Sequence, residues 1–161
     1  MTKEEFASRI EGMMRTLYSV CYAQLRQRCD REDAVQEALR KCWQKRDQLR
    51  DERYFNTWVI RILINECHNI QRQSARIQPA EIDLMAMPAG GVSRVGEALL
   101  MLEEKLRMPV VLHYMEGYSV AEIAHALRIP QGTVKTRLRK GRMVLKEILT
   151  SEIGGVVHEA I

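Results

Sequence analysis

The feature that most constrains the fold is a break in an otherwise helical pattern of apolar residues. Through most of the 161-residue chain apolar residues recur three or four positions apart, which is the period of an amphipathic helix. No stretch alternates apolar and polar residues as a strand would. Between Ser74 and Ser93 the pattern fails, and two prolines and two glycines fall in the gap. A connection of about twenty residues is too long for the inside of one compact domain, so we expect two small helical domains joined by a flexible linker.

Local signals place the helices of this all-α fold. Thr2 with Glu5, and Ser119 with Glu122, have the spacing of a capping box. Asp30 is a candidate N-cap for a second helix. We also expect a loop over 47–53 and a frayed carboxyl-terminal end. The remaining helices are expected over 54–73, 95–105, 109–117, 120–127 and 132–149. The expected domains are residues 1–74 and 94–150, with a linker over 75–93 and a tail over 151–161.

Composition excludes several classes of protein. Hydrophobic residues make up 46% of the chain, which argues against wholesale disorder. The start lacks a signal peptide, and no uncharged apolar run approaches the ~18 residues that span a bilayer, so we expect a cytoplasmic protein without membrane insertion. The four cysteines form no C-x-x-C pair, and the histidines have no metal-ligand spacing. We expect no metal, no cofactor and no catalytic residues, and a hydrolytic enzyme has little support.

The charge is concentrated near the carboxyl end. Residues 128–146 hold seven Lys or Arg and no acid, in a chain whose net charge is +4. Most of them lie on the second of two helices joined by a tight turn, which is the arrangement of a helix-turn-helix that reads DNA. One face of the last helix, from Val134 to Ile148, is apolar and is expected to pack on Ile123, Ala124 and Leu127. The candidate DNA-binding residues on the opposite side are Gln131, Thr133, Lys135, Thr136, Arg137, Arg139 and Lys140.

The helix expected over 54–73 carries a second unusual surface. Its polar strip contains Thr57, Arg61, His68 and Arg72, with Asn65 beside it and Trp58 at its edge. Aromatic rings beside cations and amides suit single-stranded DNA, because rings stack on unpaired bases. The alternative is that Tyr54, Phe55 and Trp58 are core aromatics and Asn65 is a solvated side chain. Composition alone favours that alternative, and the adjacent DNA-reading domain favours the first interpretation.

Two blocks of sequence resemble a known family. The first contains DREDAVQEA at 30–38, FNTWVIRI at 55–62 and Asn65, and the second contains LHYMEGYS at 112–119, EIA at 122–124 and GTVKTRL at 132–138. In this order and separation they resemble regions 2 and 4 of the extracytoplasmic-function (ECF) sigma factors of bacterial RNA polymerase.

The resemblance implies a promoter-specificity subunit and assigns roles to residues. Asp33, Gln36 and Glu37 would dock on the clamp helices of the core polymerase, and the last helices would read the minus-thirty-five element in duplex DNA. The linker would thread toward the RNA exit path, and the flap would be a further contact on the polymerase. An anti-sigma factor that covers the same surfaces is another implied partner. The residues implied to read and melt the minus-ten element are Leu49, Arg50, Trp58, Arg61, Asn65, His68 and Arg72.

The chain also departs from the family pattern. Leu49 stands where the family often has an aromatic residue, Arg128 where glycine is common, and Glu103 where proline is frequent. If Arg128 adopts a left-handed conformation, it costs roughly 1 kcal/mol more than glycine would. The competing interpretation of the chain is a stand-alone helix-turn-helix regulator whose amino-terminal domain senses a ligand or a partner.

Overall fold

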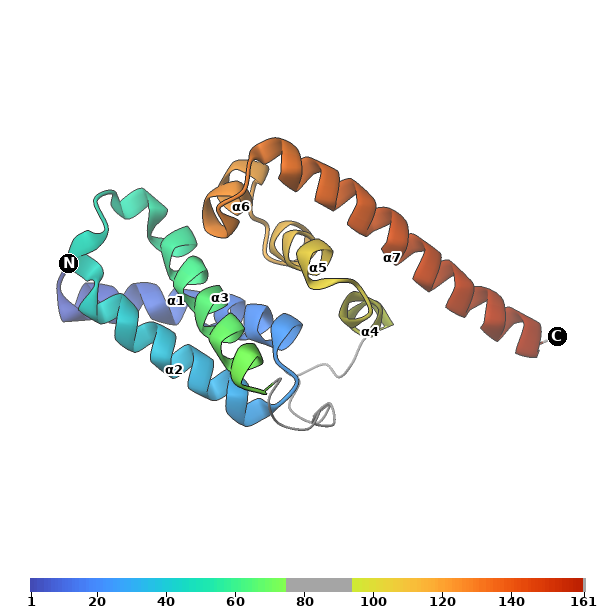
Figure 1. Ribbon diagram of the computed structural model, residues 1–161, viewed down its shortest axis with the longest axis horizontal. Coiled ribbons are helices and arrows are strands. Elements are labelled where there is room, and N and C mark those ends of the chain that lie inside the picture. Colours follow the sequence, from blue (N-terminus) through green and yellow to red (C-terminus); the bar gives the residue numbers. More distant parts are fainter. Residues whose placement is uncertain (75–93, 161) are drawn as a thin grey trace. The chain divides into compact units, whose positions relative to one another are not determined.

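The computed structural model describes residues 1–74 and 94–160, with side chains over 1–74 and 94–151. Every regular element in these segments is helical, so the expected all-α fold is confirmed (Figure 1). The linker expected over 75–93 lies outside the described residues. None of the described helices has the length and apolar character needed to cross a bilayer.

The chain divides into two compact units, which we describe separately. The first contains α1 to α3 and the second contains α4 to α7, except that His125–Leu127 at the end of α6 group with the first. In Figure 1 the first unit runs from blue to green and the second from yellow to red.

The first unit is a bundle of three helices in which α3 packs on both α1 and α2. The expected capping box at Thr2 is present, because Thr2 Oγ1 accepts the Glu5 N–H while the Glu5 carboxylate accepts the Thr2 N–H. Leu17, Val35 and Phe55 are among the fully or nearly buried core residues. The elements are α1 Lys3–Gln24, α2 Arg28–Gln44, the 3₁₀ turns η1 Arg46–Gln48 and η2 Glu52–Tyr54, and α3 Phe55–Ser74.

The start of α2 differs from the sequence expectation. Its N-cap is Gln27, and Asp30 lies inside the first turn, so the expectation that Asp30 caps the helix is wrong. The buried Arg31 donates from Nη1 to the Leu25 carbonyl oxygen at 3.1 Å. This bond ties the end of α1 to α2 across a short connection, so the helix starts earlier than the capping signal predicts. Partial burial of Asp30, together with nearby Asp33, raises the pKa of the Asp30 carboxyl.

The second unit begins with two short helices where the sequence predicts one over 95–105. The chain leaves helical geometry after Leu100 and re-enters it at Glu104. The Arg107 side chain fills this break, donating to the carbonyl oxygens of Leu99 at 3.1 Å and Leu102 at 2.6 Å. The elements are α4 Arg94–Leu100, α5 Glu104–Val110, the π-helical turn η4 Val111–Met115, α6 Val120–Leu127 and α7 Gln131–Ala160.

Two other helix boundaries in this unit also differ from expectation. Pro109 lies inside α5 rather than at the start of a helix. Its ring is fully buried, and this packing offsets the backbone hydrogen bond that proline cannot donate. The following segment ends at Gly117, as expected, with φ +76°. α7 continues to Ala160, well beyond the expected end at Leu149 and through the segment expected to fray.

Candidate nucleic-acid interface

A helix-turn-helix forms the middle of the second unit. α6 begins with the expected capping box, in which Ser119 Oγ accepts the Glu122 N–H at 3.1 Å. The helix ends at Arg128, which adopts the left-handed conformation with φ 56° and ψ 47°. The Ile129 N–H then bonds to the Ala124 carbonyl oxygen at 3.1 Å and closes the turn before α7. Arg128 therefore occupies a conformation that glycine adopts without strain.

The buried side of α7 fixes which side of the helix faces outward. Val134 and Leu138 are buried, as expected. However, this side packs mainly on α5 and α4, rather than on α6 as the sequence suggests. Gly141 makes the close approach possible, because a Cβ atom there would lie 2.7 Å from Val110 Cγ2.

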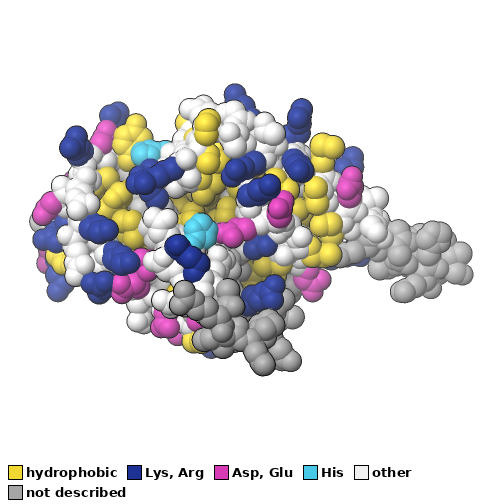
Figure 2. Space-filling view, viewed as in Figure 1, with side chains coloured by type: hydrophobic (Ala, Val, Ile, Leu, Met, Phe, Trp, Pro, Cys, Tyr) yellow, Lys and Arg dark blue, Asp and Glu magenta, His cyan; other side chains and the backbone are white. Residues whose placement is uncertain are grey.

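The exposed side of α7 carries most of the residues expected to bind DNA. Gln131, Lys135, Thr136, Arg139 and Lys140 are exposed, while Thr133 and Arg137 are partly buried. Within the described part of the chain, Lys135, Arg139 and Lys140 form no ion pair. In Figure 2 Lys and Arg side chains stand out in dark blue between apolar patches. Cations without an internal counter-charge on one helix face are suited to the phosphates of a DNA groove.

A single line of side chains follows α3 in the first unit. Trp58, Arg61, Asn65, His68 and Arg72 are spaced three or four residues apart and so lie on one side of the helix. Asn65 and Arg72 are exposed, and Trp58 and His68 are partly buried. We call these five residues the α3 line. The structure thus brings together five of the seven residues expected at the minus-ten element.

Some expectations for α3 need correction. Thr57, expected in the polar strip, is buried, and its Oγ1 donates to the Tyr54 carbonyl oxygen at 3.1 Å. Phe55 is a core aromatic, as the alternative interpretation holds, but Tyr54 is exposed. That alternative is therefore right for Phe55 and wrong for Tyr54.

Leu49 and Arg50, the other two residues expected at the minus-ten element, lie in the segment between α2 and α3. On the α2 side, the Arg46 guanidinium stacks 3.8 Å from the centre of the Trp43 ring and donates to the Trp43 carbonyl oxygen at 2.7 Å. On the α3 side, Glu52 Oε2 pairs with Arg9 Nη2 of α1 at 2.8 Å. Both ends of the segment are thus fastened to helices.

Just after Arg50, Asp51 caps η2 and stays ionised. Its Oδ1 accepts the Arg53 N–H at 3.0 Å, and its carboxylate also accepts hydrogen bonds from Nε and Nη2 of the Arg53 guanidinium. The Arg53 side chain, followed by the Arg53 backbone, lowers the pKa of the Asp51 carboxyl. The cap makes the entry into α3 a defined turn.

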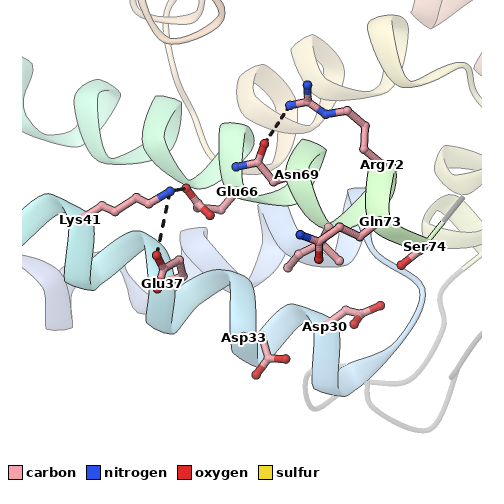
Figure 3. A pocket seen from close by; sticks show the side chains of 10 residues that line it. Asp30, Asp33, Glu37, Lys41, Glu66, Asn69, Arg72, Gln73 and Ser74 are labelled. Atoms are coloured by element: carbon pink, nitrogen blue, oxygen red, sulfur yellow. Dashed lines mark hydrogen bonds and ion pairs between the residues drawn. The ribbon is translucent and has the colours of Figure 1, made fainter. Parts of the chain in front are cut away.

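Two of the three residues expected to dock on polymerase lie on the side of the first unit shown in Figure 3. Asp33 and Glu37 point from α2 into an open groove of about 810 Å³ that α3 lines on its other side. Gln36 is exposed on the same helix. The Arg40 guanidinium donates to Glu37, with Nε at 2.9 Å, and this hydrogen bond lowers the pKa of the Glu37 carboxyl. The groove therefore presents the Glu37 carboxylate in its charged form at neutral pH.

An ion pair at the base of this groove escapes sequence reasoning. Lys41 of α2 pairs with Glu66 of α3, and its Nζ also lies 3.9 Å from Glu37 Oε1 (Figure 3). The Glu66 side chain is only 8% exposed, and that of Lys41 is 29% exposed. The sequence held one signal for this pair, since Glu66 lies in the middle of an apolar helix face. A carboxylate is buried there only when it is paired with a cation.

The described residues offer no site for a metal. No group of three or more His, Cys, Asp or Glu in the described ranges could hold an ion. Of the cysteines, Cys29 is exposed, whereas Cys21, Cys42 and Cys67 are buried.

Comparison with known proteins identifies both units. The Sigma-70 region 2 model matches residues 10–77, and the Sigma-70 region 4 model matches residues 93–145. The ECF RNA polymerase sigma factor SigW of Bacillus subtilis is 29% identical to this chain, covering 91% of this chain and 90% of SigW. The ECF RNA polymerase sigma-E factor of Escherichia coli is also 29% identical, covering 70% of each chain.

A solved structure supports the fold. The sigma factor RpoE from Bartonella quintana, crystallised in complex with the anti-sigma factor NepR, matches with a TM-score of 0.79. It is 24% identical, and the match covers 91% of this chain and 98% of that one. With one family model in each unit, this chain belongs to the sigma-70 family of RNA polymerase sigma factors. Within that family it is of the ECF type, as are the two relatives named above.

Proposed function

We propose that this sigma factor brings core polymerase to a set of promoters and helps to open them, with a separate task for each unit. The first unit docks on polymerase and melts the minus-ten element, and the second unit reads the minus-thirty-five element. The observation that carries the division is that the two units have different surfaces. One is the α3 line, and the other is the cationic side of α7. The chain has no catalysis of its own, because the polymerase makes the RNA.

Docking is assigned to Asp33, Gln36 and Glu37. They lie within one turn and a half of α2, so they share one side of it. Charged carboxylates on an open groove are ready acceptors for Lys and Arg side chains of a partner. A basic surface of the core polymerase, the clamp helices in our proposal, would compete with Arg40 for Glu37.

Strand separation is assigned to the α3 line with Leu49 and Arg50. A single strand offers flat base faces, free base edges and phosphates. The line offers a ring at Trp58, an amide at Asn65 and cations at Arg61 and Arg72. Asn65 is exposed, so its amide is available to hydrogen-bond an unpaired base.

Duplex reading is assigned to the first turns of α7. Short polar side chains, such as Gln131 and Thr136, suit base edges in the major groove. Lys135, Arg139 and Lys140 lie around them and suit the phosphates on either side. The Thr136 hydroxyl already donates to the Gly132 carbonyl oxygen at 3.0 Å, so it remains an acceptor for a base donor.

Regulation by an inhibitor belongs to the same proposal. RpoE of Bartonella quintana was crystallised with an anti-sigma factor. A protein that covered the groove of α2 or the cationic side of α7 would block polymerase or promoter here. We further propose that the chain acts in the cytoplasm, where it meets core polymerase.

The test is reconstituted transcription. The purified chain is mixed with core polymerase and a library of genomic fragments, and run-off transcripts are sequenced. We expect transcripts that start at a shared promoter sequence and are missing with core polymerase alone. A matched reaction with Glu37→Lys should lose them, since the docking carboxylate is reversed in charge.

A stand-alone regulator would give the opposite result. No transcript above that of core polymerase, together with tight binding of the free chain to an operator fragment, would overturn the proposal. The presence of a region 2 match beside the region 4 match argues against that alternative.

A further inference from the structure

Two buried cysteines from different helices lie with their sulfur atoms in contact. Cys21 is in the last turn of α1, Cys67 is in the second half of α3, and their Sγ atoms are 3.8 Å apart. Both side chains are fully buried. We call these two residues the sulfur pair. The proposed function makes no use of the pair, although it joins α1 to the helix that carries the α3 line.

Contacts on both sides of the sulfur pair hold α1 and α3 together. One turn further along both helices, the Gln71 side chain donates from Nε2 to the Gln24 carbonyl oxygen at 2.9 Å. Toward the other end, the ring of Phe6 in α1 meets the ring of Phe55 at the start of α3, with ring centres 6.0 Å apart. The two sulfur atoms therefore face each other inside a packed interface rather than at a frayed end.

The sulfur pair lies close to the geometry of a disulfide. An S–S bond is about 2.05 Å long, so the two sulfur atoms need to approach by about 1.8 Å. Rotation of the two side chains with a small shift of α3 toward α1 supplies a movement of this size. The bond would join residues 46 positions apart, and a crosslink over so long a loop stabilises a fold by restricting its unfolded chain.

The resting form of the sulfur pair is reduced, because both residues are thiols in this structure and a cytoplasm keeps thiols reduced. We infer that the pair is a redox modification site, at which a peroxide forms a disulfide that locks α1 to α3 and stabilises the first unit until a dithiol reduces it. The first unit is small, and domains of roughly 60–70 residues are marginally stable, so one crosslink changes its stability substantially. The inference does not depend on the docking and promoter roles.

The reaction balances with hydrogen peroxide as the oxidant. One thiolate attacks the peroxide, so that an S–O bond forms, the O–O bond breaks and the departing hydroxide takes up a proton to become water. The sulfur of the second thiol then attacks the sulfenic sulfur, the S–S bond replaces the S–O bond, and a second water leaves with the proton of that thiol. The two sulfur atoms lose two electrons in all. Because both are fully buried, the reaction proceeds through transient openings between α1 and α3.

The test oxidises the full chain in the Cys29→Ser form, which removes the exposed thiol and with it crosslinks between chains. The protein is treated with dilute hydrogen peroxide, the remaining thiols are alkylated in urea, and tryptic peptides are identified by mass spectrometry. Cleavage leaves Cys21 in peptide 16–26, Cys67 in peptide 62–72 and Cys42 in peptide 42–45. We expect one crosslinked species, which joins peptides 16–26 and 62–72, has lost two hydrogen atoms and separates when dithiothreitol is added.

The crosslink should also raise the melting temperature of the first unit. Trp43 and Trp58 both lie in this unit, so tryptophan fluorescence follows its melting. We expect the oxidised form to melt roughly 10 °C or more above the reduced form, and dithiothreitol to remove the difference. Cys67→Ala should give no crosslink and no shift on oxidation. Cys42→Ala, a matched control that removes another buried thiol, should keep both.

A sulfur pair that only packs would give a different result. If peroxide leaves both thiols open to alkylation, oxidises them separately to sulfinic acids or links either one to Cys42, the inference is overturned. A crosslinked form that melts with the reduced form would overturn the locking role. Cys29 of the wild-type chain is exposed and shows that the oxidant is active. The mapping and the melting of the Cys29→Ser chain need no core variant, so the inference can fail even if Cys67→Ala does not fold.

Discussion

The two units differ in where their aromatic side chains lie. Seven of the nine Phe, Trp and Tyr residues precede residue 75, and only Tyr114 and Tyr118 lie in the second unit. The second unit instead presents Lys135, Arg139 and Lys140 on α7, which form no ion pair with any residue whose side chain the structure describes. Single strands offer base faces for stacking, whereas a duplex offers phosphates and base edges. The difference in composition therefore matches the separate tasks that we propose for the two units.

The units also differ in how their helices are joined. In the first, charged pairs cross between elements, namely Lys41 with Glu66 and Arg9 with Glu52. In the second, α5 and α7 approach closely at Gly141, without room for a Cβ atom. Four predictions test this comparison, beginning with the largest expected effect.

Lys41→Ala should destabilise the first unit by about 2–3 kcal/mol, because it leaves the Glu66 carboxylate buried without a partner. This is less than the roughly 3–5 kcal/mol of a fully buried pair, since Lys41 is partly exposed. Trp43 and Trp58 both lie in this unit, so urea unfolding followed by tryptophan fluorescence measures it. Arg28→Ala, which breaks an exposed pair with Glu32, should change stability by no more than about 0.5 kcal/mol. Equal urea midpoints for Lys41→Ala and Arg28→Ala would contradict the prediction.

Arg139→Ala and Asn65→Ala should impair different steps. Loss of one phosphate contact at Arg139 should weaken the closed complex and reduce the slope of log affinity against log salt by about 0.9. Loss of the amide at Asn65 should leave that slope unchanged and lower opening roughly 5- to 10-fold, the effect of one hydrogen bond. Gel shifts across a salt series measure the first, and permanganate reactivity of unpaired thymines measures the second. An equal loss in both assays for Asn65→Ala would remove its assignment to opening.

Gly141→Ala should destabilise the second unit by a net amount of about 1 kcal/mol. The new methyl group meets the stiff Val110 side chain, at a cost of roughly 1–3 kcal/mol, while the better helix propensity of alanine returns about 1 kcal/mol. Gly132→Ala on the same helix has open space around it and should not destabilise. Circular dichroism should show the loss while the tryptophan transition of the first unit stays in place. A shift of both transitions together would mean that the units unfold as one.

The smallest expected effect is that of Gly141→Ala on cysteine labelling, because all four cysteines lie in the first unit. Burial raises the pKa of the Cys42 thiol to about 12. At pH 8 only about one Cys42 in ten thousand is then a thiolate. Cys29 is exposed, so one thiol of the four should react quickly with a disulfide reagent in the native protein. Gly141→Ala should not alter that count, and a second fast thiol would show that the first unit opens with the second.

Local signals in the sequence predicted local structure well. Both capping boxes are present, and α6 ends where the sequence places its end. Such signals involve side chains within four residues, so they act before tertiary contacts form. Where tertiary contacts decide, the sequence was misleading. α2 begins before Asp30, where the Arg31 side chain bonds to the end of α1. Burial keeps Pro109 inside a helix.

The sequence predicted which residues of the candidate site share one side of α3, but it did not predict which residues of different helices contact each other. The α3 line follows from residues three and four apart, which any helix brings to one side. The pair of Lys41 and Glu66 spans 25 residues, and only the packing of α2 on α3 brings it together. The exposure of Tyr54 was equally hidden, because it precedes the helix, whereas the helical spacing of Phe55 with Val59 and Leu63 places Phe55 on the apolar side. The docking and DNA-binding roles remain predictions.

The strained turn at Arg128 places two demands on one position. Glycine there would relax the backbone by roughly 1 kcal/mol, but it would also remove one of the seven positive charges clustered over residues 128–146. Arg128→Gly is therefore expected to stabilise the turn and, at the same time, to weaken the electrostatic attraction of this segment to DNA.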